Sequence, residues 1–459
     1  MTAKTLDKPS SLERFGYKQE LRRALSTTDL VIYGMISMVP IAPYSVFGFV
    51  WHDAKGMVPL AYVLGLVGMF FTAMSYATMS HAFPVAGSVY SYAQRGLHEI
   101  AGFFAGWLIL LDYILIPGLL YIVSAIALGP IFPGVPGWAW LAAFIGFNAI
   151  VNLAGIRFTA RANLYMLGVQ LVALALFIVV GLVALYTGHG AGRLTWRPVY
   201  DPAAFSLGTI AGATSIAVLS FLGFDAISTL SEESRGGEKS VGRATLLALL
   251  LVGALFLLQT WIATDLAQGM QFSSPATAFY EICRVAGGPW LERITLGAVV
   301  LSSGIANAMA AQAATSRVLF AMARDRKLPA VLAKVHPRFR TPYVSTLVVA
   351  AISLVVGLWF SSRLDDLSRI VNFGALTGFL LLHLSVISHC FVRQRSGRWL
   401  HHLIFPLAGL LVIAYVLYEM DTGAKVMGAC WIAVGIVYYA LLSLVLKRPT
   451  ALEVDARSE

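Results

Sequence analysis

The feature that most constrains the fold is an apolar segment that cannot form one continuous helix. Residues 28–50 are long and apolar enough to cross a bilayer, yet Pro40 and Pro43 stand near their middle. Each proline lacks a backbone N–H and clashes with the preceding helical turn. A helix break inside hydrocarbon persists only where it is buried in protein or lines a cavity. The segment therefore indicates either a simple proline kink or the discontinuous helix of a secondary transporter's substrate site.

The composition predicts an all-α polytopic membrane protein. The chain is 58% hydrophobic and only 12% charged, about half the charge of a soluble protein. About twelve apolar runs are long enough to be transmembrane helices, and their connections leave no room for a separate soluble domain. The runs lie at 28–50, 57–81, 101–128, 138–155, 163–187, 205–230, 244–266, 294–323, 343–361, 368–392, 401–418 and 426–446.

The positive charge predicts an orientation in the inner membrane. The net charge is +10, but with the N-terminus inside and alternating loops, most Lys and Arg residues fall in the inner segments. This asymmetry follows the positive-inside rule, so we expect both termini in the cytoplasm and no nucleic-acid partner. Residues 1–27 are polar and predict a cytoplasmic segment rather than a signal peptide. Residues 447–459 predict a cytoplasmic tail.

Metal and enzyme chemistry have no support in the sequence. The three cysteines, Cys283, Cys390 and Cys430, are scattered, which favours packing roles over a disulfide framework or a metal site. There is no HExxH cluster, and no G-x-S-x-G motif stands in a convincing context. We therefore expect neither a metal nor a cofactor, and no enzymatic activity.

A second weak helix stands five spans after the first. The run 205–230 contains Gly208, Gly212 and Gly223. Discontinuous helices at matching places in two halves are the expected mark of an inverted-repeat transporter. We therefore expect a 5+5 inverted repeat with discontinuous helices 1 and 6, made of residues 28–187 and 205–392. Two C-terminal helices at 401–446 would complete the bundle.

Two carboxylates lie in the central thirds of the predicted spans, Asp112 and Asp225, and neither has a Lys or Arg nearby in sequence. A buried acid must face a polar cavity, carry a proton or meet a cation. Either residue could thus bind an ammonium group or carry a proton; the structural alternative is a protonated acid bonded to backbone. His383 could relay protons, or it could be a satisfied core histidine.

Aromatic side chains flank the same places. They could wall an apolar pocket or contact an ammonium by cation–π attraction, although most aromatic residues in such a chain serve packing. The candidates are Tyr44, Trp107, Tyr113, Phe221 and Phe224.

Four motifs together resemble the amino acid–polyamine–organocation (APC) superfamily in the correct order and over nearly the whole chain. They are SYATMSHAFPVAGSVYSYAQR from Ser75, NLAGIRFTARAN from Asn152, SFLGFDAISTLSEES from Ser220, and SRVLFAMARDRKLP from Ser316 followed by KVHPRFRTPYVS. The resemblance implies a five-plus-five inverted repeat with two extra spans, and a substrate held between the unwound parts of spans 1 and 6. It also implies proton-coupled uptake or exchange of amino acids or amines.

Two departures from the family pattern bear on the substrate. Members that bind amino acids usually carry a Gly-Ser/Thr-Gly run in span 1 that binds the substrate carboxylate, but Met38, Val39 and Pro40 stand here. Gln170 stands where some members use a lysine in proton coupling. Loss of the carboxylate-binding run, together with two buried acids, favours a substrate with two ammonium groups and no carboxylate. The chain resembles the bacterial putrescine importers in its proline-containing span 1, in the LDY sequence that ends at Tyr113 and in the FPVAGS stretch from Phe83. The two ammonium groups of extended putrescine lie roughly 6 Å apart.

We therefore predict an inner-membrane importer of putrescine or a similar small diamine, coupled to protons. Asp225 would be the primary ammonium ligand, with Asp112 and Tyr113 serving the second ammonium or the proton path. Glu232 and Glu233 would form gate contacts or an ordinary solvated loop. The alternatives are an amino acid or amine permease, or a membrane sensor that does not transport. The partners would be a cationic amine, protons and the bilayer. The other residues that we expect to line the site are Ser37, Met38, Val39, Pro40, Ile41, Tyr44, Ser220, Phe221, Gly223 and Phe224.

Overall fold

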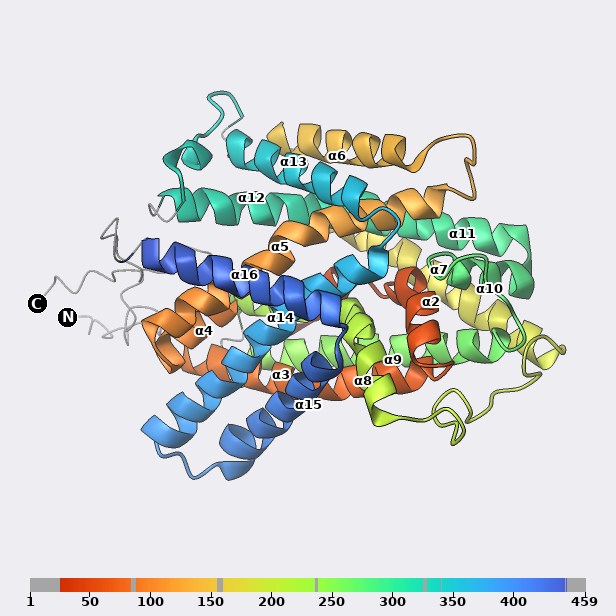
Figure 1. Cartoon of the computed structure of the whole chain (residues 1–459), viewed down its shortest axis with the longest axis horizontal. Coiled ribbons are helices and arrows are strands. Elements are labelled where there is room, and N and C mark those ends of the chain that lie inside the picture. Colours follow the sequence, from red (N-terminus) through yellow and green to blue (C-terminus); the bar gives the residue numbers. More distant parts are fainter. Residues whose placement is uncertain are drawn as a thin grey trace, which may run out of the picture.

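The chain folds into a bundle of helices (Figure 1). The computed structural model describes residues 25–441 and 443, apart from 84–87, 155–159, 236–237, 325–327 and 340. Within these residues the only β pairing is an isolated bridge between Leu25 and Ser234. The fold is therefore mostly helical, as the composition predicts.

The first half of the chain forms seven helices: α1 (Thr27–Met38), α2 (Pro43–Asp53), α3 (Val58–Ala82), α4 (Ser88–Gly96), α5 (Glu99–Leu128), α6 (Gly137–Leu153) and α7 (Ala160–Tyr186). Their ends follow local sequence rules. Ser26 caps α1 by accepting from the Asp29 amide, and the Asp29 carboxylate accepts in return from the Ser26 amide at 2.9 Å. Prolines stand at the first turns of α2 and α3, where a missing N–H costs nothing.

The second half contains more interrupted helices. They are α8 (Leu207–Ala217), the 3₁₀ segments η2 (Val218–Phe221) and η3 (Phe224–Glu233), α9 (Glu238–Leu266), α10 (Ala278–Gly287), α11 (Pro289–Val299), the π-helix η4 (Val300–Asn307), α12 (Ala308–Arg324), the 3₁₀ turn η5 (Ala330–Ala333), α13 (Tyr343–Trp359), α14 (Leu364–Val386), the π-helices η6 (Ile387–Arg393) and η7 (Leu400–Ile404), α15 (Phe405–Glu419) and α16 (Thr422–Ala440).

Each predicted apolar run coincides with a helix or a broken helix. In the described part of the chain, eight helices are long and apolar enough to cross a membrane, and the bent pair α1–α2 makes a ninth. Shorter apolar helices stand at Gly137–Leu153, Leu207–Phe221 and Tyr343–Trp359, where three further spans are predicted. The chain is thus a multi-pass membrane protein, and the count of twelve spans stays a prediction.

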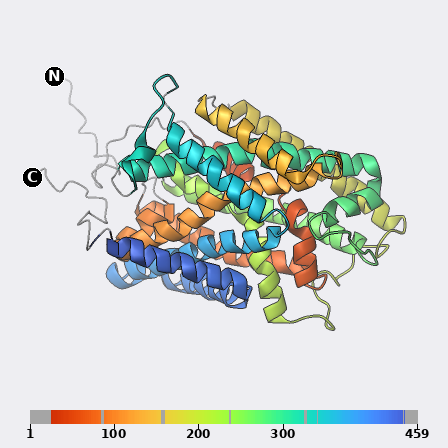
Figure 2. The same ribbon diagram turned by 45° about the horizontal axis from the view of Figure 1, so that its top comes forward.

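The helices pack around a core of buried apolar and aromatic side chains, in which small and polar residues are also buried, and many apolar residues face outward. α3 lies along α9, α14 along α5, and α1 against both α9 and η3. In Figure 2, α14–α16 (blue) form one side of the bundle and α6–α7 (gold) the other. The outer face of α7 exposes Val172, Val179 and Val183, as expected of a helix in contact with lipid.

Candidate functional site

The predicted break in the first span is present. α1 ends at Met38, α2 begins at Pro43, and the two helices differ in direction by 57°. Val39 at the bend has a φ of 53°, which is rare for a β-branched residue. The Pro40 carbonyl accepts a hydrogen bond of 3.0 Å from Nε2 of Gln259 on α9. The break leaves the Pro40 carbonyl without a partner in its own helix, and the Gln259 side chain supplies one.

The second weak helix is also broken, and its break meets the first. α8 tightens into the 3₁₀ segment η2, Leu222 is extended, and Gly223 has a φ of 107° before η3 begins. A Cβ atom on Gly223 would lie 2.7 Å from the Ser37 carbonyl oxygen. Both the left-handed φ and this close approach require glycine. The backbones of the two discontinuous segments are thus in direct contact.

Asp225 lies in the first turn of η3, directly after this contact. Its carboxylate lies close to the Tyr76 hydroxyl of α3 and to backbone amides of the turn around it, which favour its charged form. The Asp225 carbonyl oxygen accepts from the Ser228 hydroxyl at 2.6 Å. The sequence singled out Asp225 but not Tyr76, which comes from a different helix.

Asp112 of α5 lies close enough to Asp225 for their charges to repel each other. The Tyr113 side chain is within electrostatic reach of both carboxylates. Oδ1 of Asp112 is buried and has no hydrogen-bond partner among the described residues. In the same part of the chain, no ion pair joins either acid to a Lys or Arg. The two acids therefore form a site with two acidic groups and no basic partner among the described residues.

Two neighbouring helices hold Asp112 in place. Gly374 of α14 lies so close to α5 that a Cβ atom would come within 2.7 Å of the Leu108 carbonyl oxygen. On the other side, the Thr315 hydroxyl of α12 donates to the Tyr113 carbonyl at 2.7 Å. The acid is thus fixed on a rigid part of the bundle, which favours a defined binding geometry.

The two acids are not sealed into the core. Asp112, Tyr113 and Asp225 keep part of their surface accessible, as do Ser37 and Gly223 at the two breaks. The other predicted residues of the first break are buried: Met38, Val39, Pro40 and Ile41. Polar groups that stay accessible at mid-span are those that a bound ligand could reach.

Tyr44 and Trp107 contact other aromatic residues. The Tyr44 ring stacks on Phe279 of α10 with centroids 4.0 Å apart and meets the edge of Phe177 on α7. Trp107 stacks on Trp431 of α16 at 4.7 Å, and each indole N–H donates to the other residue's carbonyl at 2.9 Å. The Trp107 indole therefore attaches α16 to α5.

Phe221 and Phe224 support the second break from two directions. The ring centroid of Phe221 lies 5.1 Å from that of Phe256 on α9, and the ring centroid of Phe224 lies 5.8 Å from that of Phe379 on α14. Both rings are fully buried. The Ser220 hydroxyl hydrogen-bonds to the Tyr62 hydroxyl at 2.9 Å.

The predicted coupling and gating residues differ in their surroundings. His383 is fully buried, and its ring nitrogens lie 2.9 Å from the Ser75 hydroxyl and 3.3 Å from the Thr72 hydroxyl. Both nitrogens thus have neutral partners, as in a satisfied core histidine. Gln170 is buried on α7, and its Oε1 has no partner among the described residues. The backbone of Glu232 and Glu233 ends η3, and their side chains lie outside the described residues.

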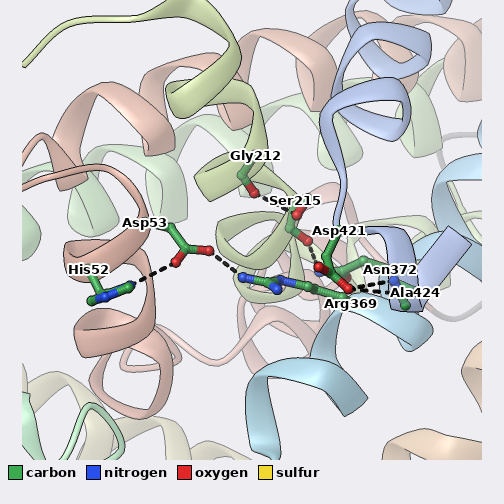
Figure 3. Close-up of polar contacts among 9 residues, drawn as sticks. His52, Asp53, Gly212, Ser215, Arg369, Asn372, Asp421 and Ala424 are labelled. Atoms are coloured by element: carbon green, nitrogen blue, oxygen red, sulfur yellow. Dashed lines mark hydrogen bonds and ion pairs between the residues drawn. The ribbon is translucent and has the colours of Figure 1, made fainter.

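An ion pair that the sequence did not reveal joins the broken span to α14. The Arg369 guanidinium of α14 binds the Asp53 carboxylate at the end of α2 (Figure 3). The His52 ring also contacts Asp53, at 3.1 Å. One turn along α14, the Asn372 amide donates to the Ser215 carbonyl of α8 at 2.7 Å. α14 is therefore tied to both discontinuous spans.

Metal-binding clusters are absent from the described residues. No group of three or more His, Cys, Asp or Glu side chains in these residues comes close enough to hold a metal ion. The chemistry that this site offers to a ligand is thus carboxylate, hydroxyl and backbone chemistry.

Comparisons with known proteins agree with this architecture. Residues 29–440 match the amino acid permease family model. The chain is 31% identical to the low-affinity putrescine importer PlaP of Escherichia coli, over 94% of this chain and 96% of the relative. It is 27% identical to the branched-chain amino acid permease BcaP of Bacillus subtilis (93% and 94% covered) and 26% identical to the methylthioribose transporter of that organism (93% and 94% covered). The chain belongs to the amino acid permease family of the APC superfamily.

Proposed function

We propose that this protein is a secondary transporter that imports putrescine or a similar small diamine by alternating access, coupled to protons. The observation that carries the proposal is the pair Asp112 and Asp225, two like charges beside the meeting point of two broken helices. No basic side chain pairs with them in the described part of the chain. A ligand with two ammonium groups supplies the charge that the site lacks.

The same pair offers a physical basis for coupling to protons. Two neighbouring carboxylates inside the membrane-spanning bundle are costly when both are charged, so an empty site favours uptake of a proton. A diamine with ammonium groups roughly 6 Å apart would neutralise both acids and displace that proton. Proton and substrate binding would thus depend on each other through one pair of residues. Tyr113, close to both acids, would complete the wall.

The wider architecture belongs to the proposal as well. Residues 28–187 and 205–392 would be the two inverted repeats, and residues 401–446 would add helices 11 and 12. We place the protein in the inner membrane with both termini cytoplasmic, because most of the positive charge then lies inside. The relative PlaP is a putrescine importer by name, and it aligns with nearly the whole chain.

A second candidate function is a permease for amino acids or other amines. The amino acid permease BcaP and the methylthioribose transporter are similar to this chain over almost the same span, which favours this alternative. The chemistry of the first break opposes it, because Pro40 has no N–H for a carboxylate and the Ala42 amide already donates to the Val39 carbonyl at 2.8 Å.

The deciding experiment is uptake of labelled putrescine into proteoliposomes, with and without a proton gradient directed inward. We expect the gradient to stimulate uptake, and we expect cadaverine to compete while neutral amino acids do not. Uptake of amino acids with no response to putrescine would overturn the diamine proposal and favour the second candidate.

A further inference from the structure

A separate pocket lies at the end of the bundle where α2 and α9 finish. Its volume is about 240 Å³. Three segments build it: the end of α2, the loop between α7 and α8, and the end of α9. The lining residues are Trp51, Lys55, Gly56, Arg197, Pro198, Asp201, Thr264, Gln268 and Gly269.

The pocket has a surplus of positive charge. Asp201 is its only acid, and its carboxylate already accepts from Nε of Arg197 at 2.9 Å and from the Ala203 amide at 3.0 Å. These two hydrogen bonds hold the pKa of Asp201 below its usual range. The Lys55 ammonium has no ion-pair or hydrogen-bond partner in the part of the chain that the structure describes. The lining therefore contains two basic residues, Lys55 and Arg197, and one acid that is already paired.

A buried hydroxyl adds an independent sign of a ligand. Thr264 lines the pocket and is only 2% exposed, and its Oγ1 has no hydrogen-bond partner among the described residues. A buried hydroxyl without a partner costs about 1–3 kcal/mol. A ligand that accepts a hydrogen bond from Thr264 would remove this cost.

The walls of the pocket are held firmly. The Asp265 carboxylate at the end of α9 accepts from the Thr195 amide at 2.8 Å and from its hydroxyl at 2.6 Å. The Trp261 indole donates to the Thr195 carbonyl at 2.8 Å. This loop is thus attached to α9 just before Arg197, which preforms the site for a small molecule.

We propose that this pocket binds a small organic carboxylate. Lys55 and Arg197 would hold the carboxylate by charge-assisted hydrogen bonds, and Thr264 would donate a further one. The Trp51 indole and the Pro198 ring offer apolar surface for a short stem. This site is distinct from the acid pair, because its charge has the opposite sign and its residues come from the end of the bundle.

Occupancy of the pocket should stabilise the end of the bundle around α2. Lys55 follows Asp53 by two residues, and Asp53 already binds Arg369 of α14. A carboxylate held between Lys55 and the loop would join α2 to α9 as well. Because a ligand that binds only the folded protein stabilises it, the unfolding temperature should rise with carboxylate concentration.

The test is calorimetric titration of the full-length protein in nanodiscs with sodium butyrate, whose four carbons suit the volume. Butylammonium chloride and sodium chloride serve as the cationic and inorganic probes. We expect Lys55→Gln to weaken butyrate binding about tenfold or more and Thr264→Val to weaken it severalfold. Lys425→Gln is the matched control, because that ammonium donates to the Tyr418 carbonyl instead, and its affinity should stay unchanged.

Four results would overturn the proposal: no butyrate binding, butyrate affinity unchanged by Lys55→Gln, loss of binding in Asp225→Asn, or chloride binding as tightly as butyrate. Preferred binding of butylammonium would equally contradict it. The thermal unfolding of each variant without ligand separates loss of the site from loss of the fold.

Discussion

Asp53 at the end of α2 and the pair Asp112 and Asp225 differ in whether a basic residue balances their charge. At the end of α2, Asp53 has a guanidinium partner in Arg369 and a second contact with His52. At the meeting point of the broken helices, Asp112 and Asp225 have each other and no described basic residue. The charge of Asp53 is thus balanced within the protein, whereas a ligand or a proton must balance the charge of Asp112 and Asp225.

This difference separates acids that hold helices together from acids that are available to bind a ligand. An ion pair between α2 and α14 fixes two helices relative to each other but leaves little charge for a ligand. Two acids on α5 and η3, beside the broken spans, lack a basic partner among the described residues and keep accessible surface. A charge inside a membrane is costly without compensation, so an uncompensated pair is maintained where function needs it.

The largest effect should follow Asp225→Asn. A neutral amide cannot compensate a buried ammonium, and loss of one member of a buried ion pair costs about 3–5 kcal/mol. We expect the initial rate of putrescine uptake in proteoliposomes to fall at least about a hundredfold. Asp421→Asn at the exposed N-cap of α16 is the control and should transport normally, because asparagine caps a helix as well as aspartate does. Unchanged uptake by Asp225→Asn would remove this residue from the site.

A smaller and more selective effect is expected for Asp112→Asn. If this acid holds the second ammonium, its loss should weaken the binding of putrescine about tenfold. This corresponds to about 1.4 kcal/mol, close to the smallest free energy expected for a hydrogen bond to a charged group. Butylamine, which has one ammonium, should then compete about as well as putrescine. Inhibition constants against labelled putrescine measure this difference. Equal losses for both amines would instead assign Asp112 to the proton path.

Breaking the paired group should slow transport only severalfold. Arg369→Gln leaves Asp53 without its guanidinium, and Asp53→Asn leaves the partly buried Arg369 without its acid. The double variant removes both charges and should recover part of the lost rate. A double-mutant cycle on uptake rates gives the coupling energy. Additive single effects would show that the pair does not act as a unit in transport.

Local sequence signals predicted the helices and the first break well. Pro40 and Pro43 remove backbone donors, and the chain bends between Met38 and Pro43 because a helix cannot continue there. Apolar runs likewise located the membrane helices, since their length and composition are local properties.

Contacts between distant helices could not be predicted in this way. Arg369 and Asp53 are 316 positions apart, and nothing local marks them as partners. The same holds for Gln259, whose role at the Pro40 carbonyl depends on how α9 packs against α1. The sequence shows only that the Gln259 amide stands inside the apolar run 244–266 and therefore needs a hydrogen-bond partner. It does not show which residue that partner is. For Trp107 the sequence left open a pocket wall or a packing role, and its ring packs on Trp431 of α16.

The smallest effect should be a gain of function at the first break. Replacing Val39 and Pro40 together with Ser and Gly restores an N–H group and removes bulk where other family members bind a carboxylate. Because Asp112 and Asp225 remain and still favour cations, we expect only weak inhibition of putrescine uptake by a neutral amino acid such as alanine. Wild type should show none. Thermal unfolding controls for folding, because Gln259 bonds to the carbonyl of the replaced proline. A folded variant that alanine does not inhibit would show that the two acids, rather than the missing backbone donor, exclude carboxylates.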